Sequence, residues 1–492
     1  MVGTPGRLPR FVVAAPGSGH GKTMVATGLM AALRARGLAV SPHKVGPDYI
    51  DPSYHGLAAG RVGRNLDPFL CGEELVAPLL RHGAAVPFAA DIAVIEGVMG
   101  LFDGAIGRDG FASTAHVAKL VEAPVILVVD CAASARSVGA TVHGFATYDP
   151  EVNVAGVILN NVASPRHEAE ARAGVERTGL PVLGSVPRLP QLVVPSRHLG
   201  LVPVAERHPD AVSAVDALAD LITEYVDLDA LLAIALTAPP LTAEPWTPAA
   251  SLTDSTPADP TLRRAKPVIA VFGGPAFSFT YAENVEQLTA AGAAVVVVDP
   301  LRSGGLPAGT SALVIGGGFP EMHVTELAKN RRLLGEVAHF ARTGGPVVAE
   351  CAGLLYLGRA LDGHPLAGVL PMSGAMTPKL TLGYRRATAV ADSPIVRAGE
   401  QVAGHEFHRT AVAWDDTRPA WTWPVADGST AAEGWAGPTV HASYLHVHGA
   451  GHPEQAVRLV EAARDFARAL LDVTQVLERV DLHFSETTRP QP

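Results

Sequence analysis

Short apolar runs alternate with longer amphipathic stretches along the first half of the chain. The runs are FVVAA, IAVIEG, VILVVD and VAGVILN, and each is followed by a turn or by a segment with helical periodicity. Continuous apolar runs of this length between helices are typical of strands buried on both faces of a parallel sheet. We therefore expect an α/β fold, with a first doubly wound parallel-sheet domain over residues 8–235.

The alternation stops near Pro239 and resumes near Pro267. The intervening segment is rich in proline and has neither a helical nor a strand period, so we interpret residues 236–266 as an interdomain linker. A long internal loop is the alternative. Beyond this segment, the runs VIAVFGG, AVVVVDP, ALVIGGG and PVVAECAG predict a second doubly wound parallel-sheet domain over residues 267–470.

A helical pattern begins near the C-terminus. Between about His452 and Phe484, apolar residues recur at helical spacing, namely at Val457, Val460, Ala463, Ala467 and Leu470. This pattern predicts an amphipathic helix that packs on the second domain. We assign residues 471–492 to a C-terminal tail.

Composition and charge exclude several classes of protein. Hydrophobic residues make up 48% and charged residues 17% of the 492 positions, which provides large cores and little sign of disorder. The net charge of −10 argues against a nucleic-acid partner, since that would require a basic face. No C-x-x-C pair occurs among the three cysteines, Cys71, Cys131 and Cys351, which disfavours a disulfide framework or zinc site and fits a reducing compartment. Without a signal-peptide core or a membrane-length apolar stretch, we expect a cytoplasmic protein with no membrane partner.

The stretch PGSGHGKT follows the first predicted strand and precedes a predicted helix. Its glycines allow the backbone N–H groups to face an anion, and these glycines are Gly17, Gly19 and Gly21. Lys22 would reach the outer phosphates of a nucleotide, and the Thr23 hydroxyl would bind magnesium. Pro16 stands where the strict motif has glycine, but the order of strand, turn and helix still predicts a site for ATP with Mg²⁺.

Two further loops offer carboxylates for this site. DIAVIEGVMGLFDG predicts a strand that ends at Glu96 and a loop that reaches Asp103, while HKVGPDYIDPSYH contains Asp48, Tyr49 and Asp51. The carboxyl ends of parallel strands are where such sheets bind ligands. A single acidic residue in a loop is usually only solvated, but several acids on loops of one sheet favour a site. We therefore expect Glu96, together with Thr23, to hold the metal.

PVVAECAGLLYL places Cys351 on a sharp turn between a predicted strand and a predicted helix. Such a turn is expected to expose the thiol, and the helix N-terminus favours the thiolate. HASYLHVH offers His446 and His448 as bases, since a nucleophile and its base need to meet only in space. The glycines of IGGGFPE would supply backbone N–H groups to an oxyanion.

Eight motifs together resemble the cobyrinate and hydrogenobyrinate a,c-diamide synthases of corrinoid biosynthesis. They are KVGPDYIDPSYH, IEGVMGLFDG, PSRHLGL, AFSFTYAEN, GGGFPE, AECAGLLYL, GHEFH and ASYLHVH, and they extend from about residue 10 to about residue 450. This family joins a P-loop synthetase domain, similar to dethiobiotin synthetase, to a class I-type glutaminase domain. The resemblance implies a cytoplasmic ligase that uses ATP, Mg²⁺, L-glutamine and a corrinoid tetrapyrrole.

The resemblance also implies roles for particular residues. Cys351 would be the glutaminase nucleophile and His446 its base, with Gly317 and Ala352 as oxyanion donors. The synthetase step would depend on Asp48, Glu96 and Asp103, the corrin would lie near Tyr49 and Ile50, and the nucleotide base near Asn160 and Arg197. His448 stands where many class I glutaminases have the acidic third member of the triad. This departure predicts a base without a carboxylate to orient it, and hence a weaker glutaminase that depends on the synthetase domain.

The function implied is amidation of the a and c carboxylates of the corrin ring, through an acyl phosphate and glutamine-derived ammonia. A sister enzyme such as cobyric acid synthase, acting on other carboxylates of the ring, is one alternative. A P-loop switch ATPase with an inactive amidotransferase domain is another, disfavoured because Gly17 stands where such switches carry lysine. The Ala/Gly/Val/Arg-rich composition is typical of a GC-rich, often aerobic source. Since the oxygen-dependent route amidates metal-free hydrogenobyrinate, we expect this substrate rather than cobyrinate. The sequence leaves the oligomeric state open, a homodimer being one option.

Overall fold

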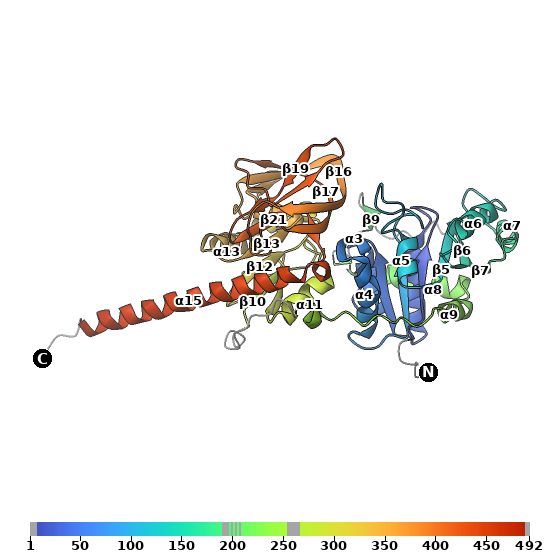
Figure 1. Cartoon of the computed structure of the whole chain (residues 1–492), viewed down its shortest axis with the longest axis horizontal. Coiled ribbons are helices and arrows are strands. Elements are labelled where there is room, and N and C mark those ends of the chain that lie inside the picture. Colours follow the sequence, from blue (N-terminus) through green and yellow to red (C-terminus); the bar gives the residue numbers. More distant parts are fainter. Residues whose placement is uncertain are drawn as a thin grey trace. The chain divides into compact units, whose positions relative to one another are not determined.

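The computed structural model describes residues 7–188, 196–197, 200–201, 204–205, 208–252 and 266–487. For residues 196–197, 200–201, 208 and 472–487 only the backbone is described. The chain divides into two compact units, residues 1–247 and 248–492 (Figure 1). Within the described residues, no helix combines the length and the apolar character needed to cross a membrane.

The first unit is built on a seven-stranded parallel sheet in the order β3-β2-β4-β1-β5-β6-β7. The strands are β1 (Arg10–Ala14), β2 (Val40–Val45), β3 (Arg64–Leu66), β4 (Ile92–Glu96), β5 (Val125–Asp130), β6 (Val154–Val162) and β7 (Val182–Pro187). Every residue of β1, β2 and β4 is buried, as expected for strands covered on both faces. The expected parallel sheet is thus confirmed.

Helices connect these strands and cover the sheet. They are α1 (Lys22–Ala35), α2 (Asp51–Ala59), α3 (Pro68–Cys71), α4 (Glu73–Ala85), α5 (Thr114–Leu120), α6 (Val138–Thr147), α7 (Pro165–Glu176), α8 (His208–Tyr225) and α9 (Leu228–Ala235). Side-chain caps begin several of them; for example, Ser113 accepts a hydrogen bond from the His116 amide at the start of α5. A small antiparallel pair, β8 (Ser196–Arg197) and β9 (Gly200–Leu201), follows β7.

The expected linker is shorter than residues 236–266. Leu241 and Trp246 are buried, and the Trp246 amide donates to Pro78 O at 3.0 Å. The Trp246 ring also packs edge-on against His82 of α4, at 5.0 Å between centroids. Residues 236–247 therefore belong to the first unit, because an apolar side chain every few residues anchors them there. Residues 253–265 lie outside the described residues, and α10 (Pro248–Ser251) begins the second unit.

The core of the second unit is a six-stranded sheet in the order β11-β10-β12-β13-β21-β20. Its strands are β10 (Val268–Phe272), β11 (Ala294–Val298), β12 (Thr310–Ile315), β13 (Val347–Glu350), β20 (Trp435–Ala436) and β21 (Val440–Ser443), and all pairs except β20–β21 are parallel. The helical elements are α11 (Ala282–Ala290), η3 (Pro320–Met322), α12 (Val324–Lys329), α13 (Arg331–Arg342), α14 (Ala352–Leu357), η4 (Gly449–Gly451) and α15 (Pro453–Thr487). The second expected α/β domain is confirmed.

A largely antiparallel sheet, which the apolar pattern did not predict, is added to this unit. It contains β14 (Ala360–Leu361), β15 (His364–Pro365), β16 (Met372–Ala389), β17 (Gln401–Trp414), β18 (Trp421–Pro424), β19 (Thr430–Glu433) and β22 (His446–Val447). The long β16–β17 pair forms most of it, in the orange part of Figure 1. Much of β16 is exposed or half-buried, so its sequence lacks the continuous apolar run of a parallel strand.

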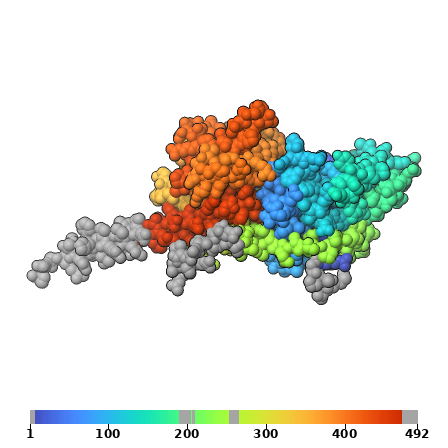
Figure 2. Space-filling view, in the orientation of Figure 1, coloured from blue at the N-terminus to red at the C-terminus, as the bar shows by residue number. Residues whose placement is uncertain are grey.

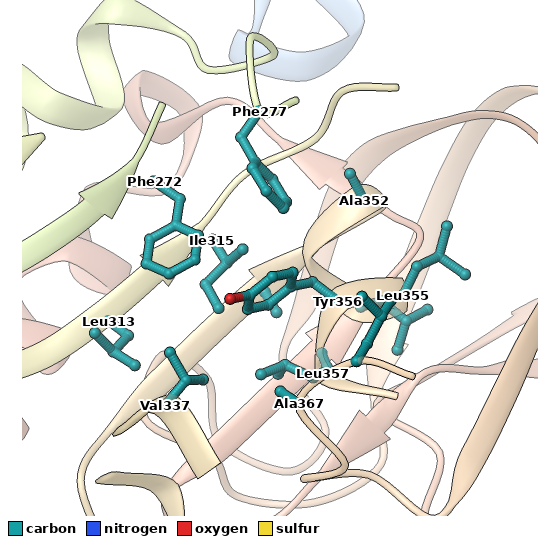
Figure 3. Close-up of a cluster of buried hydrophobic side chains, with 14 of the residues drawn as sticks. Phe272, Phe277, Leu313, Ile315, Val337, Ala352, Leu355, Tyr356, Leu357 and Ala367 are labelled. Carbon is teal, nitrogen blue, oxygen red and sulfur yellow. The ribbon is translucent and has the colours of Figure 1, made fainter. Parts of the chain in front are cut away.

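Aromatic and aliphatic side chains pack against α14 and form a buried core (Figure 3). Phe272, Phe277 and Tyr356 pack edge to face, with ring centroids 5.4–5.6 Å apart. Leu313, Ile315 and other aliphatic side chains surround them. Because Tyr356 and its neighbours on α14 are buried in this core, the turn that precedes the helix is held in place.

The C-terminal helix α15 agrees only in part with its predicted packing face. Val457, Val460 and Ala463 are buried, and Phe466 packs on Phe340 at 5.1 Å between ring centroids. Figure 2 shows this part of the helix in red at the surface of the second unit. Leu470, however, is 48% exposed, so this end of the predicted apolar face is less buried than the part around Val460.

Candidate functional site

The glycine-rich turn between β1 and α1 has the backbone that a phosphate-binding loop requires. Gly19 and Gly21 both have a φ of +84°, in the left-handed region that favours glycine. A Cβ on Gly21 would also lie 2.1 Å from Nδ2 of Asn160, so the position tolerates only glycine. Gly17 has an ordinary backbone and open surroundings, which leaves space in front of the loop.

Lys22 lies at the start of α1 with its side chain turned towards the loop that follows β4. Its Nζ donates a hydrogen bond to Met99 O at 2.8 Å. Burial, together with the nearby ammonium of Lys44, lowers the pKa of Lys22, and Glu96, Asp51 and Asp103 oppose that decrease. Within the described part of the chain, the ammonium donates to one carbonyl beside the phosphate loop, and a phosphate would be a stronger partner for it.

A buried ionic network lies beside this loop. Thr23 Oγ1 is 2.6 Å from Glu96 Oε1 and 3.2 Å from Asp51 Oδ2. Lys44 Nζ lies 2.7 Å from Asp51 Oδ2 and 3.0 Å from Glu96 Oε1, and His55 Nε2 lies 2.7 Å from Glu96 Oε2. The side chain of Glu96 is fully buried and that of Lys44 is 3% exposed. Four elements, β2, β4, α1 and α2, thus bring these groups together.

Glu96 and Lys44 remain ionised in this network although both are buried. Burial alone would raise the pKa of Glu96, but Lys44 and the hydrogen bond from His55 outweigh it and hold that pKa below its ordinary value. Burial alone would lower the pKa of Lys44, but Asp51 and Glu96 raise it instead. A buried ammonium and a buried carboxylate therefore both remain ionised at neutral pH, each stabilised by the other.

Asp48 differs from its neighbours. Burial, with repulsion from Asp51, raises the pKa of Asp48 from 3.8 to about 7, although Lys44 opposes the increase. Its Oδ1 accepts hydrogen bonds from the amides of Ile50 and Asp51, at 2.7 and 3.2 Å. Near neutral pH this carboxyl is therefore poised between its charged and neutral forms, as suits a group that binds or transfers a proton.

The other predicted residues of the first unit have mixed outcomes. Asp103 Oδ2 accepts the Gly100 amide at 2.9 Å and so shapes the loop over the phosphate turn. Asn160 Nδ2 donates to His20 O at 2.9 Å, in the phosphate turn itself, so its contact with a nucleotide base stays a prediction. Ile50 is buried at 4% exposure, which gives it a packing role here, whereas Tyr49 is half-buried. The side chain of Arg197 lies outside the described residues.

The sequence analysis missed Lys44 and His55. A signal was present, since Lys44 stands in VSPHKV, a strand that is buried along its whole length. A charged residue in such a strand needs a partner of opposite charge. His55 follows Asp51 by four residues, and this spacing places both side chains on one face of α2.

In the second unit, Cys351 lies on a strained turn between β13 and α14. Its φ of +50° and ψ of −102° are rare for a residue with a side chain, and its amide donates to Ser443 O at 2.7 Å. The predicted strand–turn–helix context is found here. The expectation of an exposed thiol is wrong, because Cys351 is only 5% exposed.

His446 is the base that the fold brings to this thiol. It lies on β22, opposite His405 of β17, and its side chain is 1% exposed. Burial would lower its pKa, but the Cys351 side chain, by charge and hydrogen bond, and Glu350 raise the pKa of His446 to about 10. His446 and Cys351 therefore form an interacting pair suited to nucleophilic catalysis.

The sequence analysis expected no carboxylate beside His446, but the structure brings one near its ring. Glu350 Oε2 lies 3.7 Å from His446 Nδ1, from the residue directly before the nucleophile. His448, at the position of the usual acid, instead has its Nε2 3.6 Å from Glu283 Oε2. Sequence reasoning looked for the acid after the histidine and overlooked the one beside the cysteine.

The two predicted oxyanion donors are arranged differently. Ala352 is the first residue of α14, where amides have no acceptor within the helix. The Gly317 amide instead donates to Phe279 O at 3.2 Å. A Cβ on Gly317 would lie 2.4 Å from His446 Cε1, so this glycine is needed for the approach of the base. Its role as an oxyanion donor stays a prediction that requires the bond to Phe279 to open.

Two family patterns match the chain, one in each unit. Residues 11–202 match the CobQ/CobB/MinD/ParA nucleotide binding domain. Residues 268–453 match the CobB/CobQ-like glutamine amidotransferase domain. The first match contains the phosphate loop and the ionic network, and the second contains the cysteine and its base.

Curated relatives match the chain along most of its length. A hydrogenobyrinate a,c-diamide synthase of Streptomyces coelicolor is 53% identical over 479 residues, covering 93% of this chain and 98% of the relative. Another, of Thermobifida fusca, is 52% identical over 462 residues, with coverage of 92% and 97%. A cobyrinate a,c-diamide synthase of Synechococcus sp. is 39% identical over 452 residues, with coverage of 90% and 96%.

Proposed function

The chain belongs to the family of hydrogenobyrinate and cobyrinate a,c-diamide synthases, which are glutamine-dependent amidating ligases, and from this we propose that it amidates the a and c carboxylates of hydrogenobyrinate. One observation carries the proposal: a phosphate loop with a buried lysine–carboxylate network and a cysteine–histidine pair occur in one chain. The first suits activation of a carboxylate by ATP, and the second suits release of ammonia from glutamine.

Activation is needed because a carboxylate has no leaving group that ammonia can displace. A carboxylate oxygen of the corrinoid attacks the γ-phosphorus of ATP, ADP leaves, and an acyl phosphate forms. Ammonia then adds to the acyl carbon, inorganic phosphate leaves, and loss of a proton gives the amide. Such phosphoryl transfer depends on positioning and charge neutralisation, for which Lys22, Lys44 and the amides of the phosphate loop are placed.

The oxygens around Thr23 suit Mg²⁺. The carboxylates of Asp51 and Glu96 each lie within 3.2 Å of the Thr23 hydroxyl, and hard cations prefer such oxygen ligands. These residues would hold the ion together with phosphate oxygens. When bound, Mg²⁺ would supply charge neutralisation to the phosphates. Asp51 joins the two ligands expected from the sequence, Thr23 and Glu96.

Glutamine hydrolysis is assigned to the second unit. The Cys351 thiolate attacks the side-chain amide carbon of glutamine, and the oxyanion is stabilised by the amide of Ala352. His446 gives a proton to the leaving nitrogen, so ammonia and a γ-glutamyl thioester form. His446 then takes a proton from water, whose oxygen attacks the thioester and releases glutamate and the thiol.

The choice of hydrogenobyrinate is supported by the relatives of highest identity reported above, whose names carry it. The test is to incubate the protein with hydrogenobyrinate or cobyrinate, ATP, Mg²⁺ and glutamine, and to locate new amides by mass spectrometry and NMR. We expect hydrogenobyrinate a,c-diamide, with one ATP and one glutamine consumed per amide. Amides at other positions would indicate a cobyric acid synthase-like enzyme, and absence of glutamate release under every condition would favour a switch ATPase.

A further inference from the structure

We propose that Glu350, the residue directly before the nucleophile, orients His446 and is the third member of the glutaminase triad. This inference rests on the proposed glutaminase function and deepens it. A catalytic histidine requires an acceptor at Nδ1, because that contact fixes the ring orientation and the tautomer that presents Nε2 to the nucleophile. The sequence has histidine, His448, where the usual acid would stand.

The Glu350 carboxylate bridges the strand of the nucleophile and the strand of the base. Its Oε2 lies 3.7 Å from Nδ1 of His446, and its Oε1 accepts the Val447 amide at 3.4 Å. Glu350 is the last residue of β13, paired with Ser443 of β21, so its backbone position is set by the central sheet. Catalytic hydrogen bonds are often long without substrate and tighten when it binds.

His448 is engaged elsewhere. Its Nε2 faces Glu283 of α11 at 3.6 Å, and its Nδ1 accepts the Ala450 amide at 3.3 Å. Its ring also packs against Tyr281, with centroids 4.4 Å apart. Both ring nitrogens and one ring face of His448 therefore contact residues in or next to α11 and η4. His448 and Glu283 form a second buried pair, separate from the pair at the nucleophile.

The Glu350 side chain retains contact with solvent, whereas the imidazole beside it is buried. Its side chain is 22% exposed, whereas that of His446 is 1% exposed. It borders a small cavity of about 70 Å³, whose polar lining includes Thr280, Asn284 and His452. A carboxylate beside such a cavity keeps part of its hydration, so it avoids the full cost of burial while it acts on the buried imidazole.

A purely structural role for Glu350 is the competing explanation, since its contact with the Val447 amide holds β22 in place. The variant Glu350→Gln separates the two roles, because the Gln side-chain oxygen can still accept from Val447 while the charge at His446 Nδ1 is lost. Glu350→Asp keeps the charge and shortens the reach. Glu283→Gln is the matched control, since it alters a separate carboxylate–histidine pair of the same unit at nearly the same distance.

The experiment measures glutamate release by the full chain as kcat and KM across the pH range in which imidazole titrates. For Glu350→Gln we expect kcat to fall on the order of 100-fold, below the ~10⁴-fold loss known when a closely bonded triad acid is made neutral. The KM for glutamine should stay within about threefold. Glu350→Asp should recover part of the loss, and Glu283→Gln should keep the wild-type pH profile.

A second readout is the pH dependence of Cys351 alkylation by iodoacetamide. Because Glu350 helps to raise the pKa of His446, the inflection that reports His446 should move to lower pH in Glu350→Gln. Ammonium-driven amidation should be unchanged. Wild-type kcat and an unshifted inflection in Glu350→Gln would overturn the inference; if that variant fails to fold, the same result in Glu350→Ala, which also removes the charge, would do so. Absence of glutamate release by the wild type would instead overturn the proposed function.

Discussion

Replacing Lys44 by Met tests whether the buried network of the first unit is held by charge. Met keeps most of the aliphatic volume, so the change removes an ammonium without opening a large cavity. The carboxylates of Asp51 and Glu96, 2.7 and 3.0 Å from Nζ, would then face each other without a cation. Removing one partner of a buried ion pair costs about 3–5 kcal/mol.

The lower part of that range applies here. Thr23 would still donate to Glu96, His55 Nε2 would remain 2.7 Å from that carboxylate, and the Asp51 side chain is 13% exposed. We therefore expect a loss of about 3 kcal/mol at neutral pH. For a unit of this size, that corresponds to a decrease in Tm of about 6–12 °C. ATP binding should also weaken, because a positive charge near the phosphates is lost.

The dependence on pH identifies the cause. In the wild type the pKa of Glu96 is held low, so its ionised form contributes stability above the unfolded pKa, and this is lost as pH falls through the folded pKa. In Lys44→Met the pKa of Glu96 should rise, because burial is no longer outweighed. The loss in free energy of unfolding relative to wild type should therefore grow with pH, by up to about 1.4 kcal/mol per pH unit, until Glu96 ionises in the variant.

The assay is thermal and urea unfolding of the full chain at a series of pH values, with Lys119→Met as the matched control. Lys119 is paired with Asp149 at 2.9 Å but lies at the surface, so its loss should cost less than about 1 kcal/mol. The reasoning would be refuted if Lys44→Met lost no more stability than this control, or if its deficit did not change with pH.

Three further predictions concern the nucleophile, the phosphate loop and Asp48. Cys351→Ala should abolish glutamine-driven amidation and leave ammonium-driven amidation, measured by chromatography of the corrinoid products; loss of both would contradict the division of labour between the units. Gly21→Ala should weaken ATP binding at least about tenfold by calorimetry, because its Cβ would meet Asn160 at 2.1 Å on a left-handed backbone; unchanged affinity would contradict this. Asp48→Asn should raise the free energy of unfolding above pH 7 and have little effect on it below pH 4. The reason is that the raised pKa of Asp48 means that its ionisation opposes folding. An equal effect at both pH values would argue against that pKa.

The sequence by itself determined the features that depend on neighbouring residues. Continuous apolar runs identified the parallel strands, and the order of strand, glycine turn and Lys-Thr pair identified the phosphate loop. The strand–turn–helix context of Cys351 was likewise readable, because the strained turn is formed by a few consecutive residues. Such patterns can be interpreted from the sequence because they depend on the backbone conformation and periodicity of a short segment.

Only the tertiary structure decided which distant residues meet. Lys44 becomes part of the site because β2 lies beside β4. Glu350 lies near His446 because β13 pairs with β21, and β21 is followed directly by β22. Lys44 and Glu96 are 52 residues apart, and Glu350 and His446 are 96 apart. Such distant partners are chosen by sheet order and packing, which follow from the whole chain rather than from any one segment.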